Sequence, residues 1–231
     1  MIYNELKEIN EEININERTS LDLLFIMDIT GSMSPYLNQV KDNIINIMKR
    51  ITLECPGIDI NLGLVAYTEN YQVEYNVNIE FTKNYQNLEN TIKKVNTITN
   101  DDGAEDMAWG MERALEKNWK SNARFAILVA DSPCHGSKYH SSIVSDNYPN
   151  GDPNRRNIEE LIKNLAEKNI SLFCTKITGY TDIMFQIFEN IYKDYSNCKV
   201  KVIPLESAKY LSDTVVDSAA DIYVSQRDID N

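Results

Sequence analysis

The chain alternates apolar runs with segments in which apolar residues recur at helical spacing. Four runs are apolar along nearly their whole length, which is typical of strands buried on both faces of a parallel sheet. They are residues 21–29, 58–69, 123–131 and 170–177. Helical spacing follows in five segments, at 35–51, 88–95, 107–119, 158–169 and 181–195. The alternation predicts an α/β fold, a doubly wound and mostly parallel sheet with helices on both faces.

Two further strands complete the predicted sheet. Residues 77–82 (VNIEFT) alternate in polarity and predict one antiparallel edge strand, joined to 58–69 by a hairpin. Residues 199–205 predict the other edge strand. A last helix is predicted to begin at Ser207.

We expect a single domain over residues 21–225, since no linker composition interrupts this range. Residues 1–20 are a polar lead-in and 226–231 a polar tail. Residues 132–157 are rich in Gly, Pro, Ser and Asn and too long for a routine connection, so they predict a long functional loop.

Charge and composition exclude several classes of protein. With 23 Lys and Arg against 35 Asp and Glu, the 231 residues carry a formal net charge of −12. Nucleic acids and anionic membranes both need basic surface, so neither is an expected partner. No apolar stretch reaches the length of a membrane span, and the polar lead-in is no secretory signal. The four cysteines form no CxxC pair, which favours a reducing, cytoplasmic compartment.

An oxygen-rich sequence follows the first predicted strand. Asp28 ends an apolar run, where an unpaired charge is costly unless something compensates it. Thr30 and Ser32 lie two and four residues further on, so a tight loop can direct all three oxygens to one point. Capping of the next helix by a serine would leave Asp28 unexplained.

Further acids lie at the same predicted edge. Four carboxylates fall within residues 101–106, more than helix capping requires, and Asp131 ends its strand as Asp28 does. The carboxyl ends of parallel strands meet at one edge, which is where ligands bind in such sheets. Oxygen donors without Cys or His predict Mg²⁺, with Mn²⁺ and Ca²⁺ as alternatives.

These motifs together resemble a von Willebrand factor type A (VWA) domain. DITGSM follows an apolar strand, the acidic DGAED precedes a Gly-bearing helix, and VAD ends a later strand. The resemblance covers about residues 20–225 and is greatest to the intracellular branch found beside atypical α-kinase domains. It implies a metal-ion-dependent adhesion site (MIDAS) in which Asp28, Thr30 and Ser32 form the first ligand loop.

The resemblance also implies the other ligands and the function. Asp131 would bind the ion directly or through water, and Glu105, with Asp102 as alternative, would take the loop position that usually holds Thr. The chain would then be a metal-dependent protein-binding module rather than an enzyme. In this family an acidic residue of the partner completes the metal's coordination. Three protein carboxylates would over-neutralise a divalent ion and weaken that capture.

The long loop is expected to overhang this edge, where its histidines and tyrosines either pack the loop or form part of a partner-binding rim. The rim residues predicted from the sequence are His135, Tyr139, His140 and Asp146. A zinc site built on Cys134 and the two histidines is the alternative, although their spacing fits no established zinc pattern.

Two other functions are alternatives to the binding module, namely a phosphatase and a nucleotide binder. A strand ending in Asp-x-Thr-Gly also resembles haloacid-dehalogenase-type phosphatases and phosphotransferases, in which Asp28 would be the nucleophile. That chemistry requires an acidic pair after a later strand, whereas Asp131 is followed by Ser-Pro, and no suitable lysine follows a strand. A P-loop or dinucleotide fold would need GxxxxGK or GxGxxG, and neither occurs.

Overall fold

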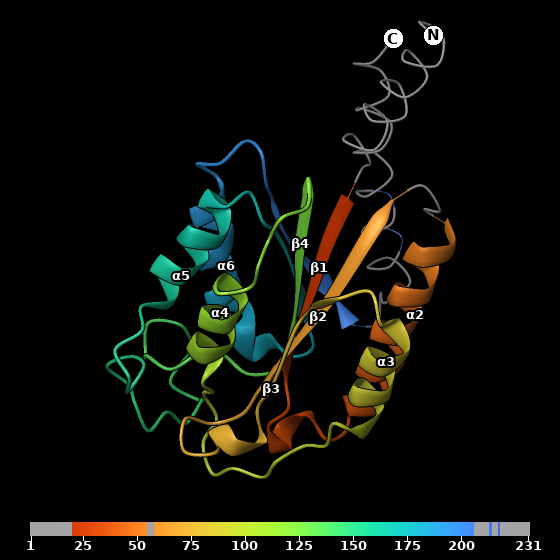
Figure 1. Ribbon diagram of the computed structural model, residues 1–231. Coiled ribbons are helices and arrows are strands. Elements are labelled where there is room, and N and C mark those ends of the chain that lie inside the picture. Colours follow the sequence, from red (N-terminus) through yellow and green to blue (C-terminus); the bar gives the residue numbers. More distant parts are fainter. Residues whose placement is uncertain (1–19, 55–57, 206–212, 214–216, 218–231) are drawn as a thin grey trace, which may run out of the picture.

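A six-stranded sheet runs through the centre of the domain in the order β3-β2-β1-β4-β5-β6 (Figure 1). The computed structural model describes residues 20–54, 58–205, 213 and 217. The strands are β1 (Ser20–Asp28), β2 (Asp59–Tyr67), β3 (Val77–Thr82), β4 (Ala123–Ala130), β5 (Ser171–Lys176) and β6 (Val200–Pro204). All neighbours pair in parallel except β2 and β3, which are antiparallel. The predicted mostly parallel sheet with one antiparallel edge strand is confirmed.

Helices cover both faces of this sheet, as predicted. Helices α2 (Leu37–Glu54) and α3 (Tyr85–Lys94) lie on one face (Figure 1). Helices α4 (Met107–Leu115), α5 (Ile158–Glu167) and α6 (Asp182–Tyr192) lie on the other.

The central strand β1 is apolar at most positions because both of its faces are buried. Leu23 and Phe25 pack into the core beneath α2 and α3, whereas Leu24 and Ile26 pack into the core beneath the other three helices. Since side chains alternate between the two faces of a strand, a two-sided core favours apolar residues at nearly every position.

One predicted helix is shorter than its periodicity suggested. The segment 107–119 is helical only to Leu115. Beyond it, the Lys117 ammonium donates to the carbonyl of Ile79, and the Trp119 indole N–H donates 2.8 Å to the carbonyl of Ala114. These side chains therefore stop the helix and tie its end to the β3 edge.

The long loop lies within the described residues, whereas both ends of the chain lie outside them. Residues 132–157 contain no helix or strand, as predicted, and α5 ends beside Asn169, whose φ of 55° suits an Asn cap. Residues 1–19, the start of the last predicted helix at Ser207 and the tail 226–231 lie outside the described residues. Within the described ranges, no helix has the length and apolar character needed to cross a membrane.

Candidate metal centre

The predicted strand-end carboxylates meet at one edge of the sheet. β1 and β4 are hydrogen-bonded neighbours, so Asp28, the last residue of β1, lies near Asp131, which directly follows β4. The Ser32 hydroxyl joins them, because it donates a hydrogen bond of 3.0 Å to Asp131 Oδ1. Residues distant in sequence therefore form one cluster, as strand order in a parallel sheet requires.

The loop after β1 directs three oxygens to this cluster. The backbone N–H and hydroxyl of Thr30 donate to Asp28 Oδ1 at 2.8 and 2.6 Å, and the hydroxyls of Thr30 and Ser32 lie 3.3 Å apart. Gly31 permits the tight turn, since a Cβ there would lie 3.2 Å from the Thr99 backbone. Asp28 Oδ2 is buried without a hydrogen-bond partner in the described structure. A free lone pair among hydroxyl and carboxylate oxygens fits a hard divalent cation.

The two candidates for the loop position have different surroundings. Glu105 is buried, and both of its oxygens accept a hydrogen bond of 3.0 Å from the Asn100 amide. Asp102 instead accepts the backbone N–H groups of Gly103 and Asn147, each at 2.9 Å. Asp102 thus anchors the long loop, while Glu105 joins the cluster around Asp28.

The other two acids of the 101–106 segment have structural partners. Asp101 accepts a hydrogen bond from the Tyr71 hydroxyl at the surface. Asp106 caps α4 and pairs at 2.7 Å with Arg156, which pairs at 2.7 Å with Asp152. Capping and ion pairing therefore account for part of the acidic excess that the sequence showed.

Glu69 is a site residue that our sequence reasoning missed. It follows β2 by two residues and is fully buried, and its Oε1 has no hydrogen-bond partner in the described structure. The signal was present in the sequence, because Glu69 ends an apolar strand run as Asp28 and Asp131 do. The VWA motifs that the sequence resembles do not include this position, so they gave no reason to select Glu69.

Ionising the carboxylates of this cluster is energetically costly when no cation is bound. Burial, reinforced by the charges of Asp131 and Glu69, raises the pKa of Asp28 to about 8. Burial, Asp28 and Glu69 together raise the pKa of Glu105 well above its usual value, and burial raises that of Asp131. Each shift disfavours the ionised form. A bound divalent ion would offset this cost directly.

The residues predicted as a partner-binding rim have their polar groups engaged inside the loop 132–157. His135 Nδ1 and His140 Nε2 lie 2.9 and 3.0 Å from the two oxygens of Asp146, and both histidines are buried. Tyr139 is half-buried and donates to Glu159 at 3.0 Å. These contacts fix the loop's shape. Direct contact of these side chains with a partner stays a prediction.

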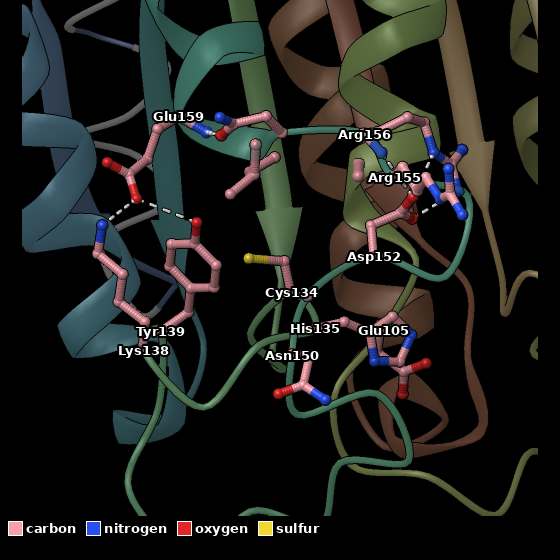
Figure 2. Close-up of a pocket in the computed structure, with 14 residues that line it drawn as sticks. Glu105, Cys134, His135, Lys138, Tyr139, Asn150, Asp152, Arg155, Arg156 and Glu159 are labelled. Atoms are coloured by element: carbon pink, nitrogen blue, oxygen red, sulfur yellow. Dashed lines mark hydrogen bonds and ion pairs between the residues drawn. The ribbon is translucent and has the colours of Figure 1, made fainter.

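A cavity of about 530 Å³ lies between this loop and helices α4 and α5. Figure 2 shows Lys138 and Tyr139 turned toward Glu159 on one side and Arg156 beside Asp152 on the other. Glu105 and His135 also line it, so the cavity adjoins the carboxylate cluster. Cys134 lines it as well, but complete burial raises the pKa of its thiol well above the usual value, so a thiolate ligand is disfavoured.

Comparison with known proteins gives one family. The model of the von Willebrand factor type A domain matches residues 22–208. A curated relative, the "Alpha-protein kinase vwkA" of Dictyostelium discoideum, is 31% identical over 212 residues. The alignment covers 88% of this chain and 33% of the relative, so the chain spans about a third of that protein's length.

Solved structures share the fold at low sequence identity. The pilus adhesin SpaC from Lactobacillus rhamnosus GG, in its open conformation, matches with a TM-score of 0.59 at 13% identity. The match covers 88% of this chain and 30% of the adhesin. The D319A mutant of the PilB minor pilin from Streptococcus sanguinis matches with a TM-score of 0.56 at 12% identity, over 90% of this chain and 64% of the pilin.

Proposed function

The chain belongs to the von Willebrand factor type A family, and we propose that it is a protein-binding module whose binding depends on a divalent cation at the carboxyl edge of the sheet. Domains of this family are generally binding modules. The observation that carries the proposal is the hydrogen-bonded series Asp28–Thr30–Ser32–Asp131, which ends a pair of adjacent strands and contains an unpartnered carboxylate oxygen.

Five residues would hold the ion. They are Asp28, Thr30, Ser32, Glu105 and Asp131. We favour Mg²⁺, with Mn²⁺ or Ca²⁺ as alternatives, because every donor is oxygen. The ion would neutralise the buried carboxylates and present a Lewis-acidic position to a partner. Ser32 is exposed, which leaves the edge accessible to solvent.

We propose that the partner is a protein, with no role for nucleic acid. The carboxylates of Asp28, Glu105 and Asp131 would together carry more negative charge than a divalent ion carries positive charge. Glu69 lies nearby and adds to this excess. Such a site attracts an acidic partner residue less strongly than a site with two carboxylates would. We therefore expect the loop 132–157 to supply much of the partner contact. A reducing, cytoplasmic setting is supported by Cys134, Cys174 and Cys198, which are buried free thiols.

The phosphatase alternative has less support from the geometry. Asp28 is fully buried, and its Oδ1 is occupied by two hydrogen bonds from Thr30. A nucleophilic carboxylate has to approach phosphorus in line, which this packing does not favour. We propose no catalytic role for Asp28.

Thermal unfolding with and without Mg²⁺ tests the proposal. Saturating Mg²⁺ should raise Tm because it binds only the folded state, and Asp28→Ala should remove the increment. An equal increment in both proteins would refute the site as drawn. Turnover of acetyl phosphate or a generic phosphatase substrate that Asp28→Asn abolishes would overturn the binding-module reading in favour of an enzyme.

A further inference from the structure

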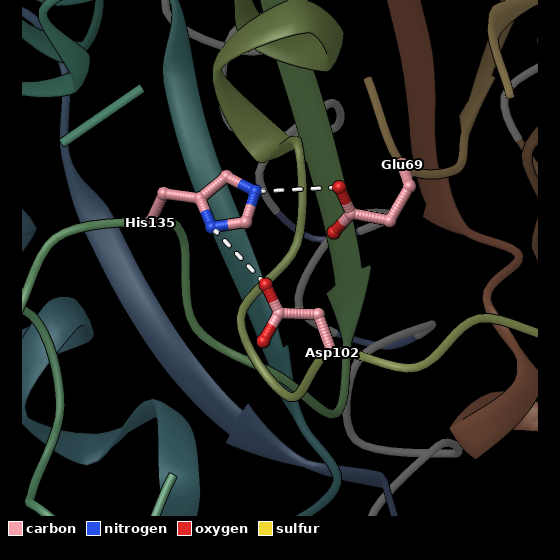
Figure 3. A group of neighbouring side chains, drawn as sticks. All are labelled: Glu69, Asp102 and His135. Carbon is pink, nitrogen blue, oxygen red and sulfur yellow. Dashed lines mark ion pairs between the residues drawn. The ribbon is translucent and has the colours of Figure 1, made fainter. Parts of the chain in front are cut away.

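His135 has a buried ring nitrogen that lacks a hydrogen-bond partner. Its imidazole lies between the carboxylates of Glu69 and Asp102 (Figure 3). Nδ1 is 2.9 Å from Asp146 Oδ1, a normal hydrogen-bond distance. Nε2 faces Glu69 Oε2 at 3.4 Å and makes no hydrogen bond within the described structure, and the side chain is only 1% exposed.

The separation between His135 and Glu69 is informative. A charge-assisted N–H···O bond has a donor–acceptor distance of about 2.7–2.9 Å, so 3.4 Å is too long for one. An imidazole nitrogen and a carboxylate oxygen bound to one zinc ion at about 2.0–2.1 Å, at a tetrahedral angle, lie about 3.3–3.4 Å apart. Glu69 Oε1 is also buried without a partner, so this carboxylate has lone pairs to offer.

We propose that His135 Nε2 and the Glu69 carboxylate bind a second divalent ion of the transition-metal class, represented by Zn²⁺, beside the oxygen-only site at Asp28. Imidazole nitrogen is a preferred ligand of zinc and its neighbours, whereas Mg²⁺ prefers oxygen. The two sites therefore differ in metal preference although they share one edge of the sheet.

Asp146 orients the ring of His135 through Nδ1. Asp146 is held by the backbone N–H groups of Gly136 and Tyr148, each at 2.8 Å, and in turn orients Nδ1 of His135. A hydrogen bond from Nδ1–H to a carboxylate leaves the Nε2 lone pair free for a metal. Asp102 Oδ2 lies 4.0 Å from Nδ1, and its carboxylate belongs to the same group of potential metal ligands as His135 and Glu69.

The proposed site lies beside the cavity of about 530 Å³ that His135 and Glu105 line. Glu69 follows β2 and His135 belongs to the loop 132–157. The ion would therefore fasten the loop to the sheet and set the shape of the surface offered to a partner.

Zinc stoichiometry in excess Mg²⁺ tests this proposal on the full chain. With Mg²⁺ saturating the oxygen-only site, isothermal titration calorimetry should show one Zn²⁺ bound per chain, and Co²⁺ should give visible d–d bands. His135→Gln and Glu69→Gln should each weaken Zn²⁺ binding at least tenfold. Asp146→Asn should weaken it about 10–100-fold through the orientation of the ring.

His140→Gln is the matched control. His140 lies in the same loop and contacts the same Asp146, but its Nδ1 is 3.0 Å from the backbone carbonyl of Ser141 rather than from a carboxylate. Zinc affinity should stay near that of the wild type in this variant and in Asp28→Ala. A cooperative thermal transition without added metal shows that each His135 or Glu69 variant has folded.

Three results would overturn the second site. They are the absence of Zn²⁺ binding in excess Mg²⁺, equal losses in His135→Gln and His140→Gln, and loss of Zn²⁺ binding in Asp28→Ala, which would mean a single shared site. None of them bears on the Mg²⁺-dependent rise in Tm, so the two proposals fail separately.

Discussion

Asp28→Asn should be more stable than the wild type without a bound ion and less stable than the wild type when Mg²⁺ is present. The pKa of Asp28 is raised to about 8, with burial as the main cause, followed by the charge of Asp131. The raised value means that stability is fully present below the unfolded pKa of about 3.8 and is lost as pH rises toward 8. The ionisation of Asp28 alone therefore costs the ion-free fold on the order of 4 kcal/mol at pH 7 relative to acidic pH.

Asn at this position keeps the shape and cannot ionise. Its amide carbonyl can still accept from the Thr30 N–H and hydroxyl, while its NH₂ group gains no certain acceptor and costs about 1–3 kcal/mol. We expect Asp28→Asn to be more stable than the wild type in EDTA at pH 7, by about 1–3 kcal/mol. Its stability should also change less with pH between about 4 and 8.

Magnesium should then reverse the difference. At 100 times Kd an ion stabilises the fold by about 2.7 kcal/mol, or roughly 5–10 °C in Tm for a domain of this size. Asp28→Asn should gain little of this. Urea unfolding in EDTA and in Mg²⁺, at pH 5 and 7, measures both effects. A variant that is less stable in EDTA and gains as much from Mg²⁺ as the wild type would refute the assignment of Asp28 as a charged ligand.

Two further predictions concern the framework that positions the site. Gly110→Ala should cost about 1–2 kcal/mol in urea unfolding, because the new Cβ would lie 2.8 Å from Cδ1 of the buried Tyr67 and better helix propensity offsets only part of the strain. Arg156→Met should cost about 3–5 kcal/mol, since it leaves the buried carboxylates of Asp106 and Asp152 without their cation.

Two control variants test whether these losses of stability are specific to the two positions or follow any comparable substitution in the domain. Gly179→Ala should change stability by less than about 0.5 kcal/mol, because the nearest atom to its Cβ would be 3.7 Å away. Lys163→Met breaks only the exposed 3.7 Å pair with Glu167 and should cost less than about 1 kcal/mol. Losses in these controls as large as those in Gly110→Ala or Arg156→Met would contradict the packing and ion-pair arguments.

Local pattern was sufficient for the sheet and for the first ligand loop. A strand buried on both faces must be apolar at nearly every position, and this property is written in 21–29 and 123–131 without reference to any partner. Because parallel strands end at one edge, the positions of Asp28 and Asp131 in the sequence already implied their proximity in space. Thr30 and Ser32 are close enough in sequence for a turn to bring their oxygens to Asp28.

The roles of the remaining acids depended on contacts that only the tertiary structure makes. Glu105 and Asp102 stand three residues apart in one acidic run, yet Asn100 turns Glu105 into the cluster while Asn147, 45 residues away, holds Asp102 to the long loop. Glu69 and His135 meet because β2 and the loop 132–157 converge at the same edge. Sequence spacing cannot encode such a meeting, since the 65 residues between them pass through two further strands of the sheet. The sequence by itself thus determined the fold and the loop that follows β1, and the packing of the long loop decided which acids meet at this edge of the sheet.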